Sequence, residues 1–405
     1  MIDVAVVGAG PAGAWAAYSL ATRGARVLLI DPSHPREKPC GGGVTGRALD
    51  IVSPAVDVVG SRGALEVAAS RHPHDAFSVA ACDIRAARFV DSITRRSASV
   101  RLAMPDSPPD RDLVVASRAQ FDGALVAAAR AAGADVLQSR VTDLTAENGG
   151  VRIETRSGTV RASRVIGADG TNSLVRRRVA RPFRRDQLSI ATGFFAHGTT
   201  SDEIVIELTS DPPGYIWSFP RPDHLAIGIC AQADTGVTAE ALRRTTAEWI
   251  RRTGVAHGAT LQPYSWPIPS LGQRDFDQLD LAGPRWCLAG DAAGLVDPIT
   301  REGIFFALTS AQWAADALAG SGDLSAYARR VRDEAIPELA YAARLRTMFF
   351  RPAFTALMMD ALQQSGDVRA VMADLVAGRQ SYATLKWRLL TTFEIRLAWR
   401  ALGAR

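Results

Sequence analysis

The sequence predicts an α/β fold in which a parallel-sheet domain is joined to a smaller antiparallel-sheet domain and a helical C-terminal region. Residues 2 to 30 have the pattern strand, helix, strand around a glycine-rich turn. Residues 181 to 279 alternate short strands with turns, and residues 321 to 405 have a helical pattern interrupted by prolines. A chain of 405 residues is long enough for two or three such units.

The predicted domain boundaries follow these changes of pattern. The parallel-sheet domain is expected to be discontinuous, with residues 1 to 75, 112 to 180 and 280 to 320. The antiparallel-sheet domain is expected to take residues 76 to 111 and 181 to 279, and the C-terminal region residues 321 to 405.

The N-terminal segment has the pattern of a dinucleotide-binding unit. A buried strand, IDVAVV, runs into the turn GAGPAG and an alanine-rich helix, and a second strand ends at Asp31. Gly8 permits the tight turn, Gly10 lets the backbone approach a pyrophosphate, and Gly13 lets helix and strand pack closely. The helix N-terminus attracts phosphates, and Asp31 can accept hydrogen bonds from a ribose diol. The sequence therefore predicts a Rossmann-like domain, although a glycine turn without a ligand is the alternative.

Later segments repeat the motif of a strand that ends in an aspartate. Residues 164 to 170 end in GADG, and residues 286 to 291 end in Gly290-Asp291, before a long apolar helix. The Asp291 carboxylate can reach the hydroxyls of a ribityl chain, and the N–H groups of Gly303 and Ile304 can reach a flavin carbonyl. Alternatively, each aspartate caps a helix N-terminus. Residues 117 to 137 read as a further helix, with Arg118 at its start, leading into a strand.

Composition excludes several classes of protein. The four cysteines, Cys40, Cys82, Cys230 and Cys287, have no metal-ligand spacing and are expected to be free thiols. We expect no metal site and no nucleic-acid partner. No run of about 18 apolar residues is free of charge, and the chain starts directly in a strand pattern. A cytoplasmic protein is therefore expected.

The C-terminal region holds the basic excess. Residues 343 to 405 carry nine arginines and one lysine against four acidic residues. Residues 343 to 359 and 384 to 402 mix apolar stripes with arginines, namely Arg344, Arg346, Arg351, Arg388, Arg396 and Arg400. Basic amphipathic helices bind anionic lipid surfaces, which predicts a peripheral contact with the inner face of a membrane. Packing of these helices on the dinucleotide-binding domain is the alternative.

Taken together, the glycine turn, GADG and GDAAG resemble the FAD-dependent group of p-hydroxybenzoate hydroxylase type. KPCGGGV (38 to 44) and PPGYIWSFPRPDHLAIGI (212 to 229) are similar to the geranylgeranyl reductase family. That family reduces double bonds in isoprenoid chains on lipids, menaquinone or chlorophyll precursors. Two positions depart from its pattern, because Arg301 stands where a glycine is frequent and Arg221 where a lysine is frequent.

The resemblance implies FAD as cofactor and assigns roles to particular residues. The cofactor's phosphates, ribose and adenine would contact Gly8, Gly10, Ala12, Gly13, Asp31 and Val141. The flavin and its ribityl chain would contact Cys40, Gly41, Gly43, Arg118, Asp291, Gly303 and Ile304. The residues implied on the substrate side, as candidates for catalysis, are Cys40, Tyr215 and Trp217.

Reducing an isolated alkene requires a hydride from reduced flavin and a proton for the other carbon, in a dry and orienting pocket. Tyr215, Trp217 and Phe219 alternate, so they project from one face of a strand and could form a wall for a prenyl chain. They could equally be the core of the sheet. Cys40 is a candidate proton donor, or alternatively an ordinary loop cysteine.

Four functions are compatible with these motifs. The first is an FAD-dependent prenyl-chain reductase, and the alternative is an aromatic monooxygenase. A flavin halogenase would need an active-site lysine, and none lies between Lys38 and Lys386, so it is excluded unless Lys38 points inward. A non-enzymatic flavoprotein is the fourth. No second dinucleotide fingerprint is present, so the electron donor is expected to be NADPH, bound transiently, or a ferredoxin.

Overall fold

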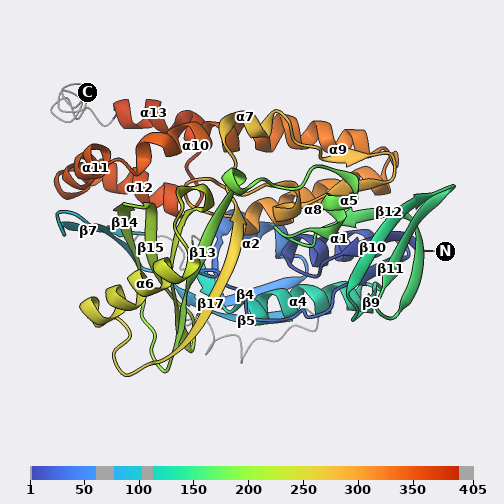
Figure 1. The fold of residues 1–405 in the computed structure, drawn as a ribbon, viewed down its shortest axis with the longest axis horizontal. Helices are drawn as coiled ribbons and strands as arrows, with labels where there is room; N and C mark the ends of the chain where they lie inside the picture. The colour runs from blue at the N-terminus through green and yellow to red at the C-terminus, as the bar shows by residue number, and fades with distance from the viewer. Residues whose placement is uncertain (1, 61–76, 103–112, 392–405) are drawn as a thin grey trace.

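The computed structural model describes residues 2–60, 77–102 and 113–391 (Figure 1). It contains three sheets, helices on the faces of the largest sheet, and a helical C-terminal region at one end, which confirms the predicted α/β class. Arg396 and Arg400 lie outside the described residues. All four cysteines are unpaired thiols.

The first sheet has the strand order β10-β11-β12-β1-β2-β9, with β19 beside β12 and β18 beside β19. Strands β12, β1, β2, β9 and β19 are parallel, whereas β10 and β11 form an antiparallel extension. The bounds are β1 (Ile2–Val7), β2 (Val27–Ile30), β9 (Asp135–Leu137), β10 (Val141–Glu147), β11 (Gly150–Thr155), β12 (Gly158–Gly167), β18 (Ala282–Gly283) and β19 (Trp286–Leu288).

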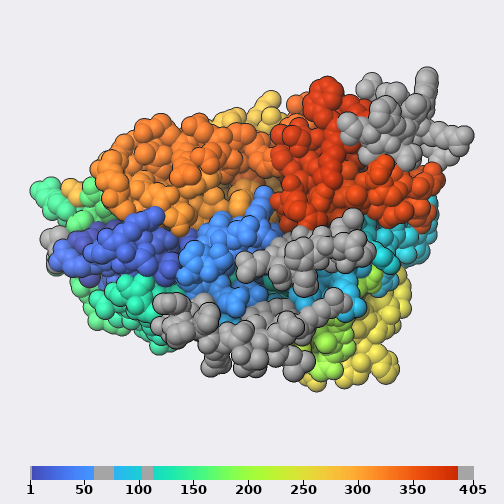
Figure 2. Space-filling model, turned by 180° about the vertical axis from the view of Figure 1, so that it is seen from behind, coloured from blue at the N-terminus to red at the C-terminus, as the bar shows by residue number. Residues whose placement is uncertain are grey.

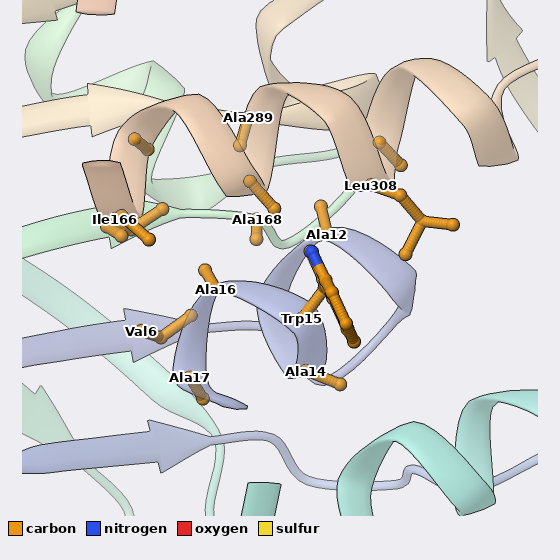
Figure 3. Packing of buried hydrophobic residues seen from close by; sticks show 14 of the residues in the cluster. Val6, Ala12, Ala14, Trp15, Ala16, Ala17, Ile166, Ala168, Ala289 and Leu308 are labelled. Carbon is orange, nitrogen blue, oxygen red and sulfur yellow. The ribbon is translucent and has the colours of Figure 1, made fainter. Parts of the chain in front are cut away.

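Helix α1 (Pro11–Ala21) packs closely between this sheet and helix α8 (Ile304–Ala319) because half of its ten buried residues are alanine (Figure 3). Trp15 and Leu20 are its large buried side chains, and the indole N–H of Trp15 donates to Gln312 Oε1 of α8 at 2.9 Å. The remaining helices of this part of the fold are α4 (Arg118–Ala131), α5 (Leu174–Val179) and α9 (Leu324–Arg330), followed by a π-helical turn (Val331–Ala335).

The second sheet has the order β17-β13-β16-β15-β14-β6-β7 and is antiparallel except where β14 meets β6. Helix α6 (Ala239–Thr253) covers one of its faces, where Leu242, Trp249 and Ile250 are buried. The strands are β6 (Ala86–Asp91), β7 (Ser97–Arg101), β13 (Leu188–His197), β14 (Glu203–Ser210), β15 (Pro213–Pro220), β16 (His224–Gln232) and β17 (Thr260–Pro269).

A third, smaller sheet was not foreseen from the sequence. Its order is β3-β8-β5-β4, with β3 (Gly43–Thr45), β4 (Val56–Gly60), β5 (Phe77–Asp83) and β8 (Leu113–Ala116), and helix α2 (Gly46–Val52) follows β3. The expectation that residues 76 to 111 add strands to the antiparallel sheet holds for β6 and β7. It is wrong for β5, which pairs with β4 and β8 instead.

The C-terminal helices lie against the second sheet (Figure 2). Met358, Met359 and Leu362 of α11 share a buried cluster with Phe89 of β6 and Val100 of β7. The bounds are α7 (Gln273–Phe276), α10 (Ile336–Phe349), α11 (Pro352–Gln364), α12 (Gly366–Val376) and α13 (Tyr382–Thr391). Pro352 is the first residue of α11, where the missing N–H is no loss. Across the described ranges, every helix is too short or too polar to cross a bilayer.

Candidate functional site

The GAGPAG turn joins β1 to α1 with contacts that only glycine allows. Gly8 has φ +99°, and a Cβ there would lie 2.4 Å from the carbonyl oxygen of Ala168. At Gly13 a Cβ would lie 1.7 Å from the carbonyl oxygen of Gly8, so helix and strand would have to separate. These two glycines therefore bring the N-terminus of α1 down onto the sheet.

The N-terminus of α1 has the chemistry of a polyanion site. Gly10 is its N-cap residue, with no side-chain cap and no acidic residue in the first turn. A Cβ at Gly10 would meet only the Lys38 ammonium nitrogen at 3.0 Å and His34 Nε2 at 3.9 Å. His34 Nε2 is buried without a hydrogen-bond partner, and within the described ranges Lys38 has no carboxylate at ion-pair distance. A diphosphate fits this arrangement of helix N-terminus, cation and orphaned ring nitrogen.

Asp31 lies at the end of β2, beside the same turn. Its carboxylate accepts hydrogen bonds from the N–H of Ala9 at 3.0 Å, from the N–H of Ser33 at 2.8 Å, and from both the backbone and the ring of His34. Burial raises the pKa of Asp31, but His34 and these N–H donors outweigh burial and hold it well below its usual range. The carboxylate is thus ionised and able to accept from a ribose diol as well.

Arg118 forms a buried ion pair within α4. Its Nε and Nη2 atoms each lie 2.9 Å from an oxygen of Asp122, one turn along the helix. Although burial lowers the pKa of Arg118, the Asp122 carboxylate raises it above its ordinary value, and Arg118 also interacts with Cys40. Asp122 in turn lies 3.6 Å from His34 Nε2, so one network joins the Cys40 loop to the turn at Gly10.

The two aspartates predicted from the repeated motif behave differently. Asp169 accepts hydrogen bonds from the N–H groups of Leu174 and Val175, beside the N-cap residue Ser173, so it helps to cap α5, in line with the alternative interpretation. The carboxylate of Asp291 makes no such cap among the described residues. A Cβ at Gly303 would lie 3.3 Å from Asp291 Oδ1, which places this carboxylate at the N-terminus of α8.

Asp291 is an electrostatically unusual group. Burial raises its pKa, and the nearby cations Lys38 and Arg118 only partly oppose that shift. Gly303 is the N-cap residue of α8 and has no side-chain cap, so the first N–H groups of α8, including that of Ile304, lie beside this carboxylate. The arrangement fits hydroxyl groups that donate to Asp291 and a carbonyl that accepts from α8.

Gly290 holds α1 and α8 together at this point. It has φ +57°, and a Cβ there would meet the Cβ atoms of Ala12 at 3.1 Å and Ala307 at 3.2 Å. Ala12 therefore serves as a small packing residue as well as a neighbour of the α1 turn. Val141, expected to flank the adenine, is half-buried at the start of β10.

The Cys40–Gly43 loop is held by a buried arginine. Arg221, with no exposed side-chain surface, forms an ion pair with Glu37 and donates to the carbonyl oxygens of Cys40 at 2.5 Å and Gly41 at 3.4 Å. Gly42 has φ +89°, and a Cβ there would lie 2.5 Å from the carbonyl oxygen of Ala116. Arg221, which stands where a lysine is frequent in the geranylgeranyl reductase family, thus positions the loop.

A protein ring occupies the space left by the loop glycines. A Cβ at Gly41 or Gly43 would lie 3.0 Å or 3.3 Å from the ring of Phe219. The sequence predicts that Gly41 and Gly43 contact the flavin, and that remains a prediction. The packing of Phe219 against both glycines shows that the loop lies close against β15.

Tyr215, Trp217 and Phe219 share one face of β15 and pack in a cluster with Phe195 and Tyr264. The rings of Tyr215 and Trp217 are 5.8 Å apart, and Trp217 Nε1 is buried without a hydrogen-bond partner in the described part of the chain. The Tyr215 hydroxyl donates to the carbonyl oxygen of Thr300 at 2.9 Å, just before α8. The Cys40 loop and this aromatic face therefore meet at the N-terminus of α8.

Sequence reasoning missed several residues of this site. Of these, only Asp122 could have been predicted from the sequence, because it lies four residues after Arg118 and residues four apart on a helix are neighbours. Lys38 does point inward, toward Gly10 of the phosphate turn. The others are His34 and Glu37, which lie between the predicted residues Asp31 and Cys40, and Arg221, which comes from a distant part of the chain.

Comparison with known proteins agrees with this geometry. Residues 1–321 match the family described as FAD binding domain. A menaquinone reductase of Mycolicibacterium smegmatis is 25% identical, over 99% of this chain and 96% of that protein. A digeranylgeranylglycerophospholipid reductase of Methanothrix thermoacetophila is 28% identical, over 86% of this chain and 88% of that protein.

Solved structures share the fold. A geranylgeranyl bacteriochlorophyll reductase-like protein of Thermoplasma acidophilum superposes with a TM-score of 0.73 at 23% identity, covering 96% of this chain and 98% of that one. A flavin-dependent brominase superposes with a TM-score of 0.69 at 20% identity, with the same coverage of the two chains. At these identities the likeness concerns the fold alone. The match over residues 1–321, together with a phosphate turn and carboxylates that fit the cofactor, shows that this chain belongs to the FAD binding domain family and is an FAD-dependent oxidoreductase.

Proposed function

We propose that this oxidoreductase saturates carbon–carbon double bonds of a prenyl chain carried by a lipid, a quinone or a related isoprenoid. The observation that carries the proposal is the contact of the Cys40–Gly43 loop with the aromatic face of β15. The relatives named as reductases of menaquinone and of a digeranylgeranyl lipid support it.

The aromatic face suits a substrate without polar groups. A prenyl chain offers only apolar surface, so it is bound and oriented by burial against rings such as those of Tyr215 and Trp217. The hydroxyls of Tyr215 and Tyr264 donate to the carbonyl oxygens of Thr300 and Ile227, at 2.9 Å each. With their protons held there, the cluster presents carbon surface and excludes water.

Cys40 is the residue proposed to hold the proton. When bound and reduced, FAD supplies a hydride to one alkene carbon, so the other carbon needs a proton. The Cys40 sulfur accepts from the N–H of Gly42 at 3.3 Å, and Arg221 fixes the loop through the Cys40 carbonyl. The Cys40 side chain also interacts with the buried Arg118, so the thiol lies between the loop and the ion pair of α4.

The test is an anaerobic assay with reduced FAD and a geranylgeranyl lipid, read by mass spectrometry. Gain of hydrogen pairs is the expected result, and Trp217→Ala should lower turnover or change the preferred chain length. Trp266→Ala, at a partly exposed position of β17, is the matched control. If Trp217→Ala changes neither, the aromatic wall is refuted, and full product formation by Cys40→Ala would remove its role as proton donor.

An aromatic monooxygenase is the second candidate, because the fold is shared with a flavin-dependent brominase. If the protein is a monooxygenase, product should form only in the presence of molecular oxygen, and the product should contain one added oxygen atom. Halogenation is disfavoured, since Lys38 faces Gly10 of the phosphate turn and Arg221 is committed to Glu37 and the loop carbonyls. We propose NADPH or a ferredoxin as electron donor, to be distinguished by supplying each in turn to the anaerobic assay.

We also propose a peripheral membrane contact by the C-terminal helices. Of the seven large apolar side chains that are exposed in the described ranges, Met348, Trp387, Leu389 and Leu390 lie in α10 and α13. Lys386 neighbours them. The basic face is smaller than the sequence indicated, because Arg388 pairs with Asp374 and Arg346 points inward.

A further inference from the structure

Two arginines converge on one buried serine. Arg301, in the loop before α8, and Arg346, on α10, each donate to the hydroxyl of Ser270. Arg346 also donates to the carbonyl oxygen of Ser270 at 3.1 Å and to Gln232 Oε1 at 3.3 Å. All of these acceptors are neutral, so two positive charges meet without a negative one.

Neither guanidinium has a carboxylate within ion-pair distance in the part of the chain that the structure describes. Two of the acids nearby, Asp275 and Asp297, accept hydrogen bonds from other groups. Asp275 accepts from Arg184, Gln187 and the N–H of Gly272. Asp297 accepts from the N–H groups of Ile299 and Thr300 and from the hydroxyl of Tyr382.

The electrostatics show that the pair is uncompensated. Burial and the charge of Arg301 together lower the pKa of Arg346 to about 10, against a weaker opposing effect of Asp234 and Asp275. Arg301 Nε is buried and donates to no acceptor in the described ranges. A buried cation without a counter-charge is costly, so an anion is the missing partner.

The backbone at Arg301 is a second sign. Its φ of +62° belongs to the left-handed region that favours glycine, the residue that is frequent here in the geranylgeranyl reductase family. Strain of this kind persists where the surrounding structure or a ligand compensates it. This chain therefore keeps an arginine at a position where its backbone disfavours one.

The arginine pair adjoins the aromatic face. Arg301 directly follows Thr300, whose carbonyl oxygen accepts from the Tyr215 hydroxyl at 2.9 Å, and its charge acts on that hydroxyl. Figure 1 shows α10, which carries Arg346, running beside α7, which begins just after Ser270. One ligand could thus place an apolar chain on β15 and an anionic end between the two arginines.

We propose that Arg301 and Arg346, with Ser270, form an oxyanion site for a phosphate group at the end of the substrate. The assignment rests on the proposed function, since it places the prenyl chain of the substrate on β15. A phosphate carries up to two negative charges, which match the two guanidinium charges better than the single charge of a carboxylate does. The site is distinct from the turn at Gly10, which holds the phosphates of the cofactor.

The test titrates FAD-loaded protein with inorganic diphosphate by calorimetry, so that the turn at Gly10 is filled. Arg301→Gln and Arg346→Gln should each weaken binding about tenfold or more, because each removes charge-assisted hydrogen bonds. Arg344→Gln is the matched control, an exposed arginine two residues away on α10. Retained flavin absorbance and an unchanged urea midpoint show that the variants fold.

Three results would overturn the proposal: no heat of binding at millimolar diphosphate, equal binding by wild type and both variants, or acetate binding as tightly as inorganic phosphate. A separate assay compares geranylgeraniol with geranylgeranyl phosphate. The phosphate should lower KM in wild type and lose that advantage in Arg301→Gln. If neither compound is reduced, the proposed function fails, whereas the calorimetry still decides whether the anion site exists.

Discussion

Replacing Arg221 by methionine tests whether one buried arginine holds the Cys40–Gly43 loop. Arg221 has no exposed side-chain surface and forms the ion pair with Glu37 and the bonds to the carbonyl oxygens of Cys40 and Gly41. Methionine has a similar length and fills the space without charge. The change therefore removes the polar contacts while keeping most of the packing.

The expected loss is about 3 kcal/mol of unfolding free energy. Removing one partner of a buried ion pair costs roughly 3–5 kcal/mol, because the other charge stays behind unpaired. The lower end applies, since the Glu37 side chain is 26% exposed and keeps the hydrogen bonds from Ser117 and the N–H of Arg118. Arg221→Lys keeps the charge but cannot reach both carbonyls, so about 1–2 kcal/mol should be lost.

Urea unfolding followed by circular dichroism, at a fixed FAD concentration, measures the difference. Arg244→Met is the matched control, because its pair with Glu240 lies on the exposed face of α6 and should leave stability unchanged. A loss below about 1 kcal/mol for Arg221→Met, or a lysine variant as unstable as the methionine variant, would refute the reasoning.

Three further predictions follow from the same contacts. Gly13→Ala should abolish FAD retention after gel filtration, because its Cβ would lie 1.7 Å from the carbonyl oxygen of Gly8, whereas Gly366→Ala should retain FAD; a flavin-loaded Gly13→Ala protein would contradict this. Burial raises the pKa of Glu37, but Arg221 and the neighbouring donors outweigh it, so the folded pKa is lowered. Urea unfolding should therefore show wild type to be more stable than Glu37→Gln, with the full difference above the unfolded pKa of about 4.3. The difference should vanish as the pH falls through the folded pKa of Glu37. A difference that grows in acid would contradict a lowered folded pKa. Trp387→Ser with Leu390→Ser should weaken flotation with anionic vesicles, while Ile93→Ser, exposed elsewhere, should not, and equal flotation of all three proteins would exclude this contact.

Local patterns predicted the start of the fold well. The turn between β1 and α1 depends on Gly8, Gly10 and Gly13, which lie within six residues of one another, and its geometry is set within that segment. The alternation of Tyr215, Trp217 and Phe219 likewise placed them on one face of β15, because side chains alternate along a strand. Such features depend on the period of a single element.

Other features depend on contacts that a sequence does not display. Arg221 and Glu37 are 184 positions apart, and only the crossing of β15 over the Cys40 loop brings them together. Asp169 and Asp291 have the same strand-end motif, but only the placement of α5 decides that Asp169 is a cap. Arg346 was assigned to a basic surface by its helix pattern, yet α10 turns it toward Ser270.

The alanine contact between α1 and α8 has a consequence for which flavins can bind. With Gly290 between Ala12 and Ala307, the two helix N-termini are held at a fixed separation. In the proposed arrangement the N-terminus of α1 binds the diphosphate and that of α8 binds the flavin ring, so only a ligand of matching length can contact both. A mononucleotide flavin would satisfy only one end. A larger side chain at Ala12 or Ala307 would change the separation of the two helix N-termini, and so the preference for the dinucleotide, without altering the polar contacts to the ligand.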